Sequence, residues 1–305
     1  MRTPEDLYEL TPAADEVPPG LPLVAGLTGF ADAGGAVQQL SEYFEATVDP
    51  VPVAVFDHDE LLDYRARRPI IEFDQDHLTG YTPARLVLSK GRDEIGRPFL
   101  LLSGFEPDFH WERFTAALLS LIERFQVSTT TWVHAIPMPV PHTRPIQVTV
   151  GGNRQDLIDT MSVWRPTTRV PSNVLHLVEY RLAEIGHPVG EFVLLVPHYL
   201  ADTELPEAAV KSLEVVQAAT GLLLPTDALR EQSRDFLARV DEQVNANDEL
   251  AQLVRTLETR HDTYMAGNPL RSPLTDGEGE VPSADELAAE LEKFLAIRRH
   301  SDDDA

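Results

Sequence analysis

Short apolar segments alternate with amphipathic helical patterns from residue 21 to residue 224, and this alternation constrains the fold more than any other feature of the chain. The segments that we expect to be buried strands are short and largely apolar: 21–27, 51–56, 99–102, 132–136 and 192–196. The segments that we expect to be helices carry apolar residues at spacings of three and four: 37–44, 111–125, 173–185 and 206–219. Such alternation is typical of α/β proteins, in which helices cover both faces of one sheet. The sequence therefore predicts a three-layer α/β/α sandwich.

A polar stretch interrupts this pattern after residue 56. Residues 57–69 cannot bury a face of their own, so we expect a loop or a frayed helix there. Residues 70–73 and 86–88 have the composition of two further short strands, joined through Gly80 and Pro83.

The pattern changes again after Gly221, where no strand-like segment follows. Apolar residues recur at helical spacing from Phe236 to Leu257, and residues 245–248 are expected to divide them into a helical hairpin. We therefore expect a core domain of residues 1–224 and an acidic helical extension of residues 225–305.

The extension contains a segment rich in glycine, proline and acidic residues at about 268–282, which is typical of a flexible linker. Ser283 and Glu286 follow it with the spacing of a capping box, which predicts one last helix.

The charge and the composition exclude several classes of function. The chain has 50 acidic and 25 basic residues and a net charge of -25, which repels phosphate backbones and anionic lipid, so we expect neither nucleic-acid nor membrane binding. The first residues lack the apolar core of a signal peptide, and no apolar run approaches the length of a membrane span. The absence of cysteine excludes disulfides, thiolate metal sites and iron–sulfur clusters. We expect a cytoplasmic protein.

A glycine-rich loop, residues 29–35, follows the first expected strand and precedes a helix. Unpaired amides at such a helix start can bind an anion. The glycine spacing differs from G-x-G-x-x-G, and no P-loop lysine follows, so neither nucleotide motif is present. Two interpretations remain: Gly29 and Asp32 line a crevice, or Asp32 caps the helix with its own carboxylate.

Polar residues follow the carboxyl ends of several expected strands, which is where open α/β sheets place their ligand crevices. Our candidates for such a crevice are Gly29, Asp32, Arg68, Glu106, His134, His142 and Arg144. Arg68 belongs to a cluster of three arginines, and a guanidinium can hold a carboxylate such as Glu106 or Asp32 through two hydrogen bonds. The alternative is that these residues form ion pairs and hydrogen bonds that only fix loop conformations.

No complete catalytic or metal-binding motif is present in the sequence. Histidines never recur at the spacing that places two imidazoles on one helical face, so a zinc site would have to combine distant segments. Ser103 lacks the preceding glycine of a nucleophile elbow. We therefore expect no catalytic residue, no metal and no cofactor.

Five short motifs, taken in order, are similar to those of a known family. They are GFADAG (29–34), DYRARRP (63–69), GFEPD (104–108) with Trp111 and Phe114 behind it, HTRP (142–145) and VPHY (196–199). Together they resemble the proteasome assembly chaperone 2 family, in its actinobacterial branch, over about residues 21–224. The resemblance implies an α/β/α sandwich similar to purine nucleoside phosphorylases, with a helical extension beyond the shared core.

The resemblance also implies a function, because relatives of this family act as non-catalytic chaperones that hold proteasome α-subunits during ring assembly. Our leading hypothesis is a non-catalytic, homo-oligomeric binding or assembly protein, with a homotrimer as the first expectation and proteasome subunits or another protein as further partners. The alternative is an enzyme that acts on a nucleoside-like or other small polar substrate at the strand ends. Convergence of Arg68, Glu106, His142 and Arg144 would favour the enzyme.

Overall fold

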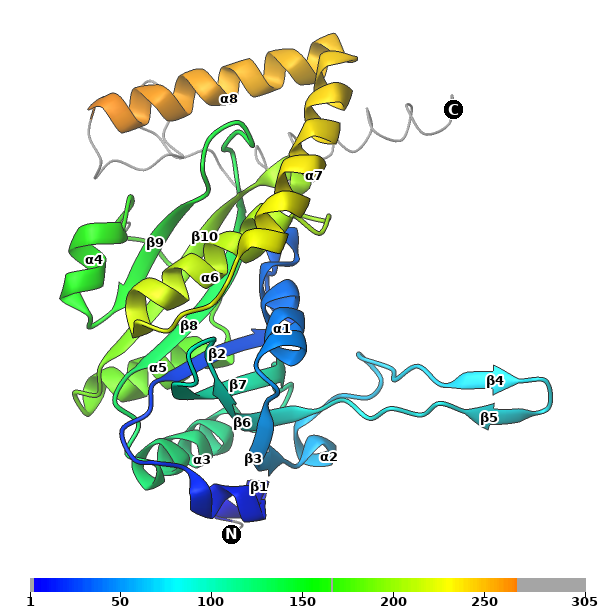
Figure 1. The fold of residues 1–305 in the computed structure, drawn as a ribbon, viewed down its shortest axis with the longest axis vertical. Helices are drawn as coiled ribbons and strands as arrows, with labels where there is room; N and C mark the ends of the chain where they lie inside the picture. The colour runs from blue at the N-terminus through cyan, green and yellow to red at the C-terminus, as the bar shows by residue number, and fades with distance from the viewer. Residues whose placement is uncertain (1–2, 166, 268–305) are drawn as a thin grey trace.

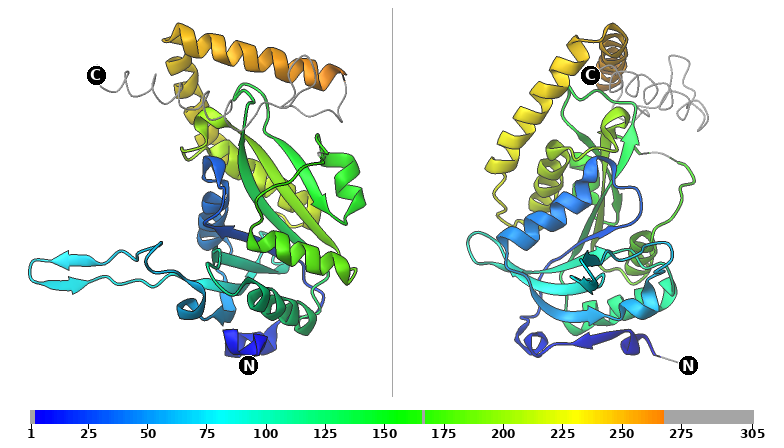
Figure 2. Two further views of the ribbon diagram at one scale, coloured as in Figure 1. Left: turned by 180° about the vertical axis from the view of Figure 1, so that it is seen from behind. Right: turned by 90° about the vertical axis from the view of Figure 1, so that its right-hand side faces the viewer.

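The computed structural model describes residues 3–165 and 167–267 (Figure 1). Both the expected linker at 268–282 and the expected helix from Ser283 lie outside the described residues. The chain forms one mixed eight-stranded sheet with helices on both faces (Figures 1 and 2). This arrangement confirms the predicted α/β fold with three layers and a C-terminal helical extension.

The strands of the sheet lie in the order β1-β3-β6-β7-β2-β8-β10-β9. Their bounds are β1 (Tyr8–Leu10), β2 (Leu23–Thr28), β3 (Val51–Phe56), β6 (Leu86–Arg92), β7 (Pro98–Phe105), β8 (Thr130–Met138), β9 (Gln147–Gly152) and β10 (Val189–Pro197). β2 pairs in parallel with β7 and β8, and β8 pairs in parallel with β10. β1, β6 and β9 pair antiparallel with their neighbours. The carboxyl ends of β2, β7, β8 and β10 therefore meet at one edge of the sheet.

Each face of the sheet is covered by its own helices and has its own hydrophobic core. α1 (Ala36–Thr47) and α6 (Pro206–Thr220) cover one face, where Phe44 packs against Phe99. α3 (Trp111–Arg124) and α5 (Val174–Glu184) cover the other face, where Phe56 packs against Phe114. Two shorter helices, α2 (His58–Leu61) and α4 (Gln155–Met161), lie in connecting segments. None of the helices in the described ranges is both long and apolar enough to cross a membrane.

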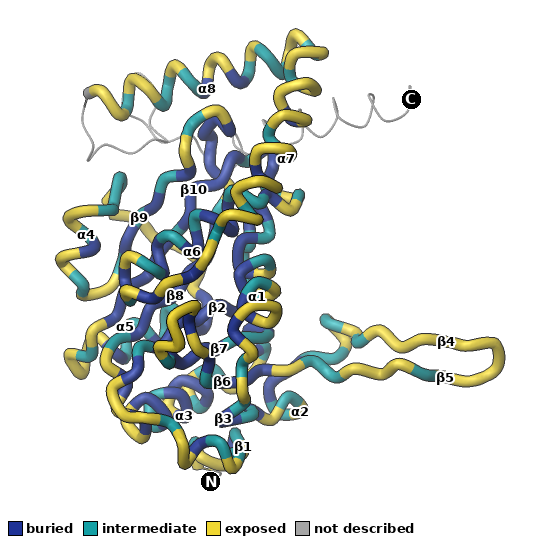
Figure 3. Tube along the Cα trace, in the orientation of Figure 1, coloured by how far each residue is buried: buried dark blue, intermediate teal, exposed yellow. Residues whose placement is uncertain are grey.

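A β-hairpin projects far from the body of the molecule (Figures 1 and 2). It consists of β4 (Glu72–Asp74) and β5 (His77–Thr79), and we call residues 65–85, which include its base, the arm. The strands expected at 70–73 and 86–88 correspond to β4 and β6, and the structure adds β5 between them. A turn at Gln75, with a positive φ of 54°, closes the hairpin of β4 and β5, and β6 pairs with β3 and β7. Figure 3 shows that the hairpin is exposed along almost its whole length.

The helical extension begins with α7 (Asp227–Asn245) and α8 (Asp248–Gly267), and the expected break at 245–248 is confirmed. The side-chain oxygen of Asn247 accepts hydrogen bonds from the amides of Glu249 and Leu250, which starts α8 in a new direction. Val240 and Leu257 are buried in the same core as α1 and α6. The extension therefore continues this core, and its division from the core domain at residue 224 stays a prediction.

Candidate functional site

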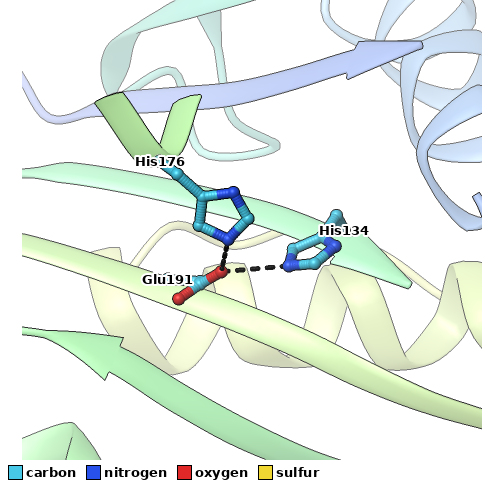
Figure 4. A group of neighbouring side chains, drawn as sticks. All are labelled: His134, His176 and Glu191. Carbon is cyan, nitrogen blue, oxygen red and sulfur yellow. Dashed lines mark hydrogen bonds and ion pairs between the residues drawn. The ribbon is translucent and has the colours of Figure 1, made fainter. Parts of the chain in front are cut away.

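Several polar side chains gather on the α5 side of the sheet, close to the carboxyl ends of β2 and β7 and beside the middle of β8. His134 of β8 was expected there from the sequence. His176 of α5 and Glu191 of β10 were not, and they join His134 in one cluster (Figure 4). We call His134, His176 and Glu191 the His–Glu–His cluster.

Glu191 is the centre of the His–Glu–His cluster. Its Oε1 atom lies 3.0 Å from Nε2 of His134 and 3.0 Å from Nε2 of His176. An ionised carboxylate only accepts hydrogen bonds, so each imidazole donates its Nε2 proton to this oxygen. Burial opposes ionisation of Glu191, but the hydrogen bonds from both imidazoles outweigh it and lower the pKa of Glu191 to about 2.

The helix start of α5 fixes the orientation of His176. Asn173 caps this helix, and its backbone amide donates a hydrogen bond of 3.0 Å to Nδ1 of His176, while the His176 amide donates to the Asn173 side chain. This arrangement requires a lone pair on Nδ1 and therefore places the proton of the neutral ring on Nε2. Burial lowers the pKa of His176, but the hydrogen bond to Glu191 and the negative charge of Glu191 raise it, and the pKa is raised overall.

Aromatic side chains enclose the cluster. Trp132, two residues before His134 on the same face of β8, stacks on its ring with centroids 5.1 Å apart and planes 12° apart. Phe30, from the glycine-rich loop, lies 6.2 Å from His134 and 6.5 Å from His176 between ring centroids. Within the described part of the chain, Nδ1 of His134 is buried and has no hydrogen-bond partner.

A second carboxyl lies beside the cluster. Oε2 of Glu179, one turn along α5 from His176, accepts a hydrogen bond of 2.8 Å from the indole nitrogen of Trp132. Burial and the negative charge of Glu191 raise the pKa of Glu179 from 4.5 to about 7. Two neighbouring glutamates therefore have pKa values pushed in opposite directions, which is a feature that marks functional sites as well as structural networks.

The His–Glu–His cluster has the composition of a metal site, because its three candidate ligand atoms lie within 4.8 Å of one another. A neutral histidine that binds a metal through Nε2 carries its proton on Nδ1 and donates it to an acceptor. Nδ1 of His176 instead receives the Asn173 amide proton. The residues present therefore do not fit a metal ion in this arrangement, and the cluster is better described as a hydrogen-bond network.

Glu106, which follows β7, binds the first turn of α5. Its Oε1 atom accepts a hydrogen bond of 2.7 Å from the amide of Val174, and burial raises the pKa of its carboxyl. Arg67 lies beside it: Nη2 donates to the backbone carbonyl of Glu106 and pairs with the carboxylate of Asp108. The arginine near Glu106 is thus Arg67, whereas Arg68 is exposed and has no such contact among the described residues.

The two loop candidates have different surroundings. The carboxylate of Asp32 accepts hydrogen bonds from the amides of Val37 and Gln38, at 2.7 Å and 3.0 Å, as the capping interpretation expects. Burial raises the pKa of Asp32. Gly29 has a φ of +124°, a backbone conformation that favours glycine, and its Cα lies close to the end of the Arg67 side chain.

His142 and Arg144 lie against the helical extension instead of joining Glu106. His142 is held by Tyr199 and by Asp241 of α7. Arg144 donates two hydrogen bonds to Asp262 of α8, at 2.9 Å and 2.7 Å. Of the sequence candidates, the structure therefore brings together Gly29 and Glu106 beside Arg67, with His134 in the adjoining cluster.

The partners of His134 were not among the candidates from the sequence, although the sequence contains one signal for them. Glu191 lies in an otherwise apolar strand, Val189–Pro197, and an acidic residue in a buried strand requires a buried partner. His176 gave a weaker signal, because a histidine three residues after an asparagine at a helix start also occurs on exposed helices.

Comparison with known proteins places this arrangement in a family. The model of the PAC2 family matches residues 26–244. A Mycobacterium tuberculosis protein of unknown function is 42% identical, with a TM-score of 0.81 over 88% of this chain and 94% of that chain. A Corynebacterium glutamicum protein of unknown function is 35% identical, with a TM-score of 0.82 over 85% of this chain and 98% of that chain.

A third solved structure shows the same fold at lower identity. It is a Mycobacterium tuberculosis proteasome-assembly chaperone homologue, 24% identical, with a TM-score of 0.69 over 77% of this chain and all (100%) of that chain. Among the curated proteins, none is significantly similar to this chain.

Proposed function

Since this chain belongs to the PAC2 family, we propose that it is a non-catalytic, homo-oligomeric binding protein that takes part in the assembly of protein chains. We further propose a homotrimer as its oligomer and the cytoplasm as its location. The observation that carries the proposal is the arm, a long projection that is exposed along almost its whole length (Figure 3) and whose exposed residues include large apolar ones.

The exposed side chains of the arm favour contact with another protein. Ile70, Phe73 and Leu78 are 86%, 69% and 60% exposed. Fully burying one such side chain contributes about 1.5–3 kcal/mol. A two-stranded hairpin is only marginally stable alone in water, so a partner surface would also order the arm.

The surroundings of the polar residues support a role without catalysis. Glu106 binds the amide of Val174, and Asp32 binds the amides at the start of α1. Both imidazoles of the His–Glu–His cluster donate to Glu191. These contacts hold helices on the sheet, which is a structural use of each group.

Two classes of partner follow from this proposal. The first is a second copy of this chain, because the arm is present on every copy. The second is a proteasome subunit, as the resemblance in the sequence implied, and one solved structure with the same fold is that of a proteasome-assembly chaperone homologue.

One observation favours a second candidate function, an enzyme that acts on a nucleoside-like or other small polar substrate. A carboxyl with a pKa of about 7, such as that of Glu179, can exchange a proton near neutral pH. Release of a base from a nucleoside, abolished by Glu179→Gln and by Glu106→Gln without loss of folding, would establish this candidate in place of the first.

Light scattering of the full chain at micromolar concentration tests the proposal. We expect an oligomer. Phe73→Ser with Leu78→Ser should raise its dissociation constant about tenfold or more, because the two substitutions remove apolar surface that association would bury. A tenfold change in a dissociation constant corresponds to about 1.4 kcal/mol. Ile95→Ser with Ile185→Ser is the matched control. These residues are 62% and 68% exposed, respectively, and lie outside the arm. A wild-type chain that stays monomeric would contradict the proposal.

A further inference from the structure

We propose that a cavity between α1 and the strands β3, β6 and β7 binds a small zwitterion of the α-amino acid class. The inference goes beyond the proposed function, because it concerns a ligand of the single chain and does not depend on association between chains.

The cavity has a volume of about 470 Å³. This volume lies within the range of small-molecule sites, which is about 300–1,000 Å³. Side chains of α1 line one side of the cavity, and residues of β3, β6 and β7 line the other. The α1 face of the sheet is opposite to the face that carries the His–Glu–His cluster, so the cavity is a separate site. The lining residues that carry the argument are Glu42, Glu45, Arg85, Ser89 and Ser103.

The sheet is more polar at this cavity than on the other face of the same strands. Toward α3 and α5, the core contains four leucines of β6 and β7: Leu86, Leu88, Leu100 and Leu102. Toward α1, Ser89 lies directly opposite Leu101, and Val87 lies directly opposite Ser103. Directly paired residues of antiparallel strands share one face. Two serines therefore interrupt the apolar face toward α1 at the place where the cavity meets the sheet.

Ser89 points to a ligand, because it is a buried polar residue without a partner. Only 4% of its surface is exposed. Within residues 3–165 and 167–267, its hydroxyl makes no hydrogen bond. Burying a hydroxyl without a hydrogen-bond partner is unfavourable. Since Ser89 lines the cavity, a polar molecule in the cavity can supply this partner.

The cavity is also lined by exposed groups of both charges. Arg85 lies directly before β6, and Glu42 and Glu45 lie three positions apart on α1. Glu42 accepts a hydrogen bond of 3.0 Å from the neutral amide of Gln38, which leaves its charge uncompensated. In the described part of the chain, Arg85 forms no ion pair with either glutamate, although all three line the same cavity. Opposite charges thus border one cavity without touching each other.

This arrangement of charges selects the class of ligand. A ligand with only negative charge would face two glutamates, and a ligand with only positive charge would face Arg85. A free amino acid carries both charges. Its carboxylate suits the guanidinium of Arg85, and its ammonium group suits the carboxylates of Glu42 and Glu45.

Thermal denaturation of the full chain with each of the standard free α-amino acids tests the site. At about 10 mM, an amino acid that binds with a dissociation constant of about 1 mM should raise the melting temperature by about 2 °C. Two derivatives of the same amino acid should give no such shift. The amide lacks the carboxylate, and the N-acetyl derivative lacks the ammonium group.

Substitutions in the cavity assign the site. Arg85→Gln should raise the dissociation constant of the amino acid about tenfold or more, and so should Glu42→Gln with Glu45→Gln, because each removes a charge-assisted contact. Ser89→Ala should raise it about threefold to tenfold, because one hydrogen bond is lost. Without ligand, Ser89→Ala should melt at the same temperature as the wild type or higher, since its hydroxyl has no protein partner to lose.

Two variants outside the cavity are the matched controls. Arg234→Gln replaces an exposed arginine of α7 and should leave binding unchanged. Ser212→Ala removes a buried hydroxyl that donates a hydrogen bond of 2.9 Å to the carbonyl of Ala208. It should lower the melting temperature but keep the shift that the amino acid causes.

The outcomes decide the proposal independently of the oligomeric state. If no amino acid raises the melting temperature, the cavity holds water only and the proposal is overturned. A shift that the amide or the N-acetyl derivative reproduces would overturn it as well, as would a shift that survives in both Arg85→Gln and Ser89→Ala. The proposed function would stand in each of these cases, because light scattering tests it separately.

Discussion

Nε2 of His142 lies 3.0 Å from Oδ1 of Asp241, and this contact joins the loop after β8 to α7 of the helical extension. The side chain of His142 is only 2% exposed, and its Nδ1 atom lies 2.6 Å from the hydroxyl of Tyr199. A buried imidazole thus connects the extension with the core of the sheet.

Replacing this imidazole should loosen the extension. We expect His142→Ala to lower the free energy of unfolding by about 2 kcal/mol, because it removes hydrogen bonds to Tyr199 and Asp241 and leaves a cavity. Urea denaturation measures the change. His77→Ala in the exposed hairpin should have almost no effect, and an equal loss in both variants would refute a special role for His142.

The pH dependence of stability should report the raised pKa of Glu179. Between its unfolded value of 4.5 and about 7, the unfolded chain releases a proton that the folded chain keeps, so stability falls as the pH rises through this window. The full loss corresponds to about 3 kcal/mol, at about 1.4 kcal/mol per pKa unit. Glu191 acts in a separate window: stability is lost as the pH falls from 4.5 toward about 2.

Glu179→Gln should make the free energy of unfolding less dependent on pH between pH 4.5 and about 7. The amide cannot ionise, and its oxygen can still accept the hydrogen bond from Trp132. Denaturant melts at a series of pH values provide the measurement, with Glu45→Gln on the exposed face of α1 as the control. An unchanged slope in Glu179→Gln would show that another group titrates there.

Gly104 should tolerate no side chain. It has a φ of +129°, and an added Cβ would lie 2.1 Å from the carbonyl oxygen of Arg85, the residue before the neighbouring strand β6. We expect Gly104→Ala to cost about 3 kcal/mol or more, from backbone strain and overpacking together. Gly96→Ala, at a φ of +82° with nothing within 4 Å, should cost only about 1–2 kcal/mol. If Gly104→Ala and Gly96→Ala unfolded at the same denaturant concentration, the steric argument would be contradicted.

The His–Glu–His cluster should bind no metal tightly. Because the Asn173 amide occupies the lone pair on Nδ1 of His176, a metal at Nε2 would have to break this helix cap. One equivalent of zinc should leave the melting temperature unchanged, and metal analysis of the purified protein should find no stoichiometric ion. A stoichiometric ion that disappears in His176→Ala would reverse this assignment.

Local patterns in the sequence were sufficient for the layers of the fold. The spacing of Trp111, Phe114 and Leu118 predicts the helix at 111–125. In an amphipathic helix the residues of the buried face recur every three or four positions, so the pattern can be recognised in the sequence alone. The break before α8 is equally local, since Asn247 caps the helix that follows it. That Asp32 caps the start of α1 with its carboxylate was one of two interpretations that the sequence allowed.

The candidate site required tertiary structure, because its members come from strands and helices that the fold alone brings together. His134, His176 and Glu191 are separated by 42 and 15 positions in the chain, and no local period relates them. His142 and Arg144 looked like neighbours of Glu106 because all three follow strands. The loop that carries them instead meets α7 and α8, whose position depends on packing against α6.

Strand partners and charge environments were also decided only in three dimensions. The composition of residues 70–73 indicates a strand, yet the turn at Gln75 determines that its partner is β5 in the arm. Likewise, Glu179 and Glu191 are the same residue type, and their opposite pKa changes arise from what surrounds each carboxyl. Local sequence patterns indicated most of the helices and strands of the core, because an amphipathic or apolar period depends only on neighbouring residues. Which distant side chains meet, and with what charge, depended on the packing of the whole chain.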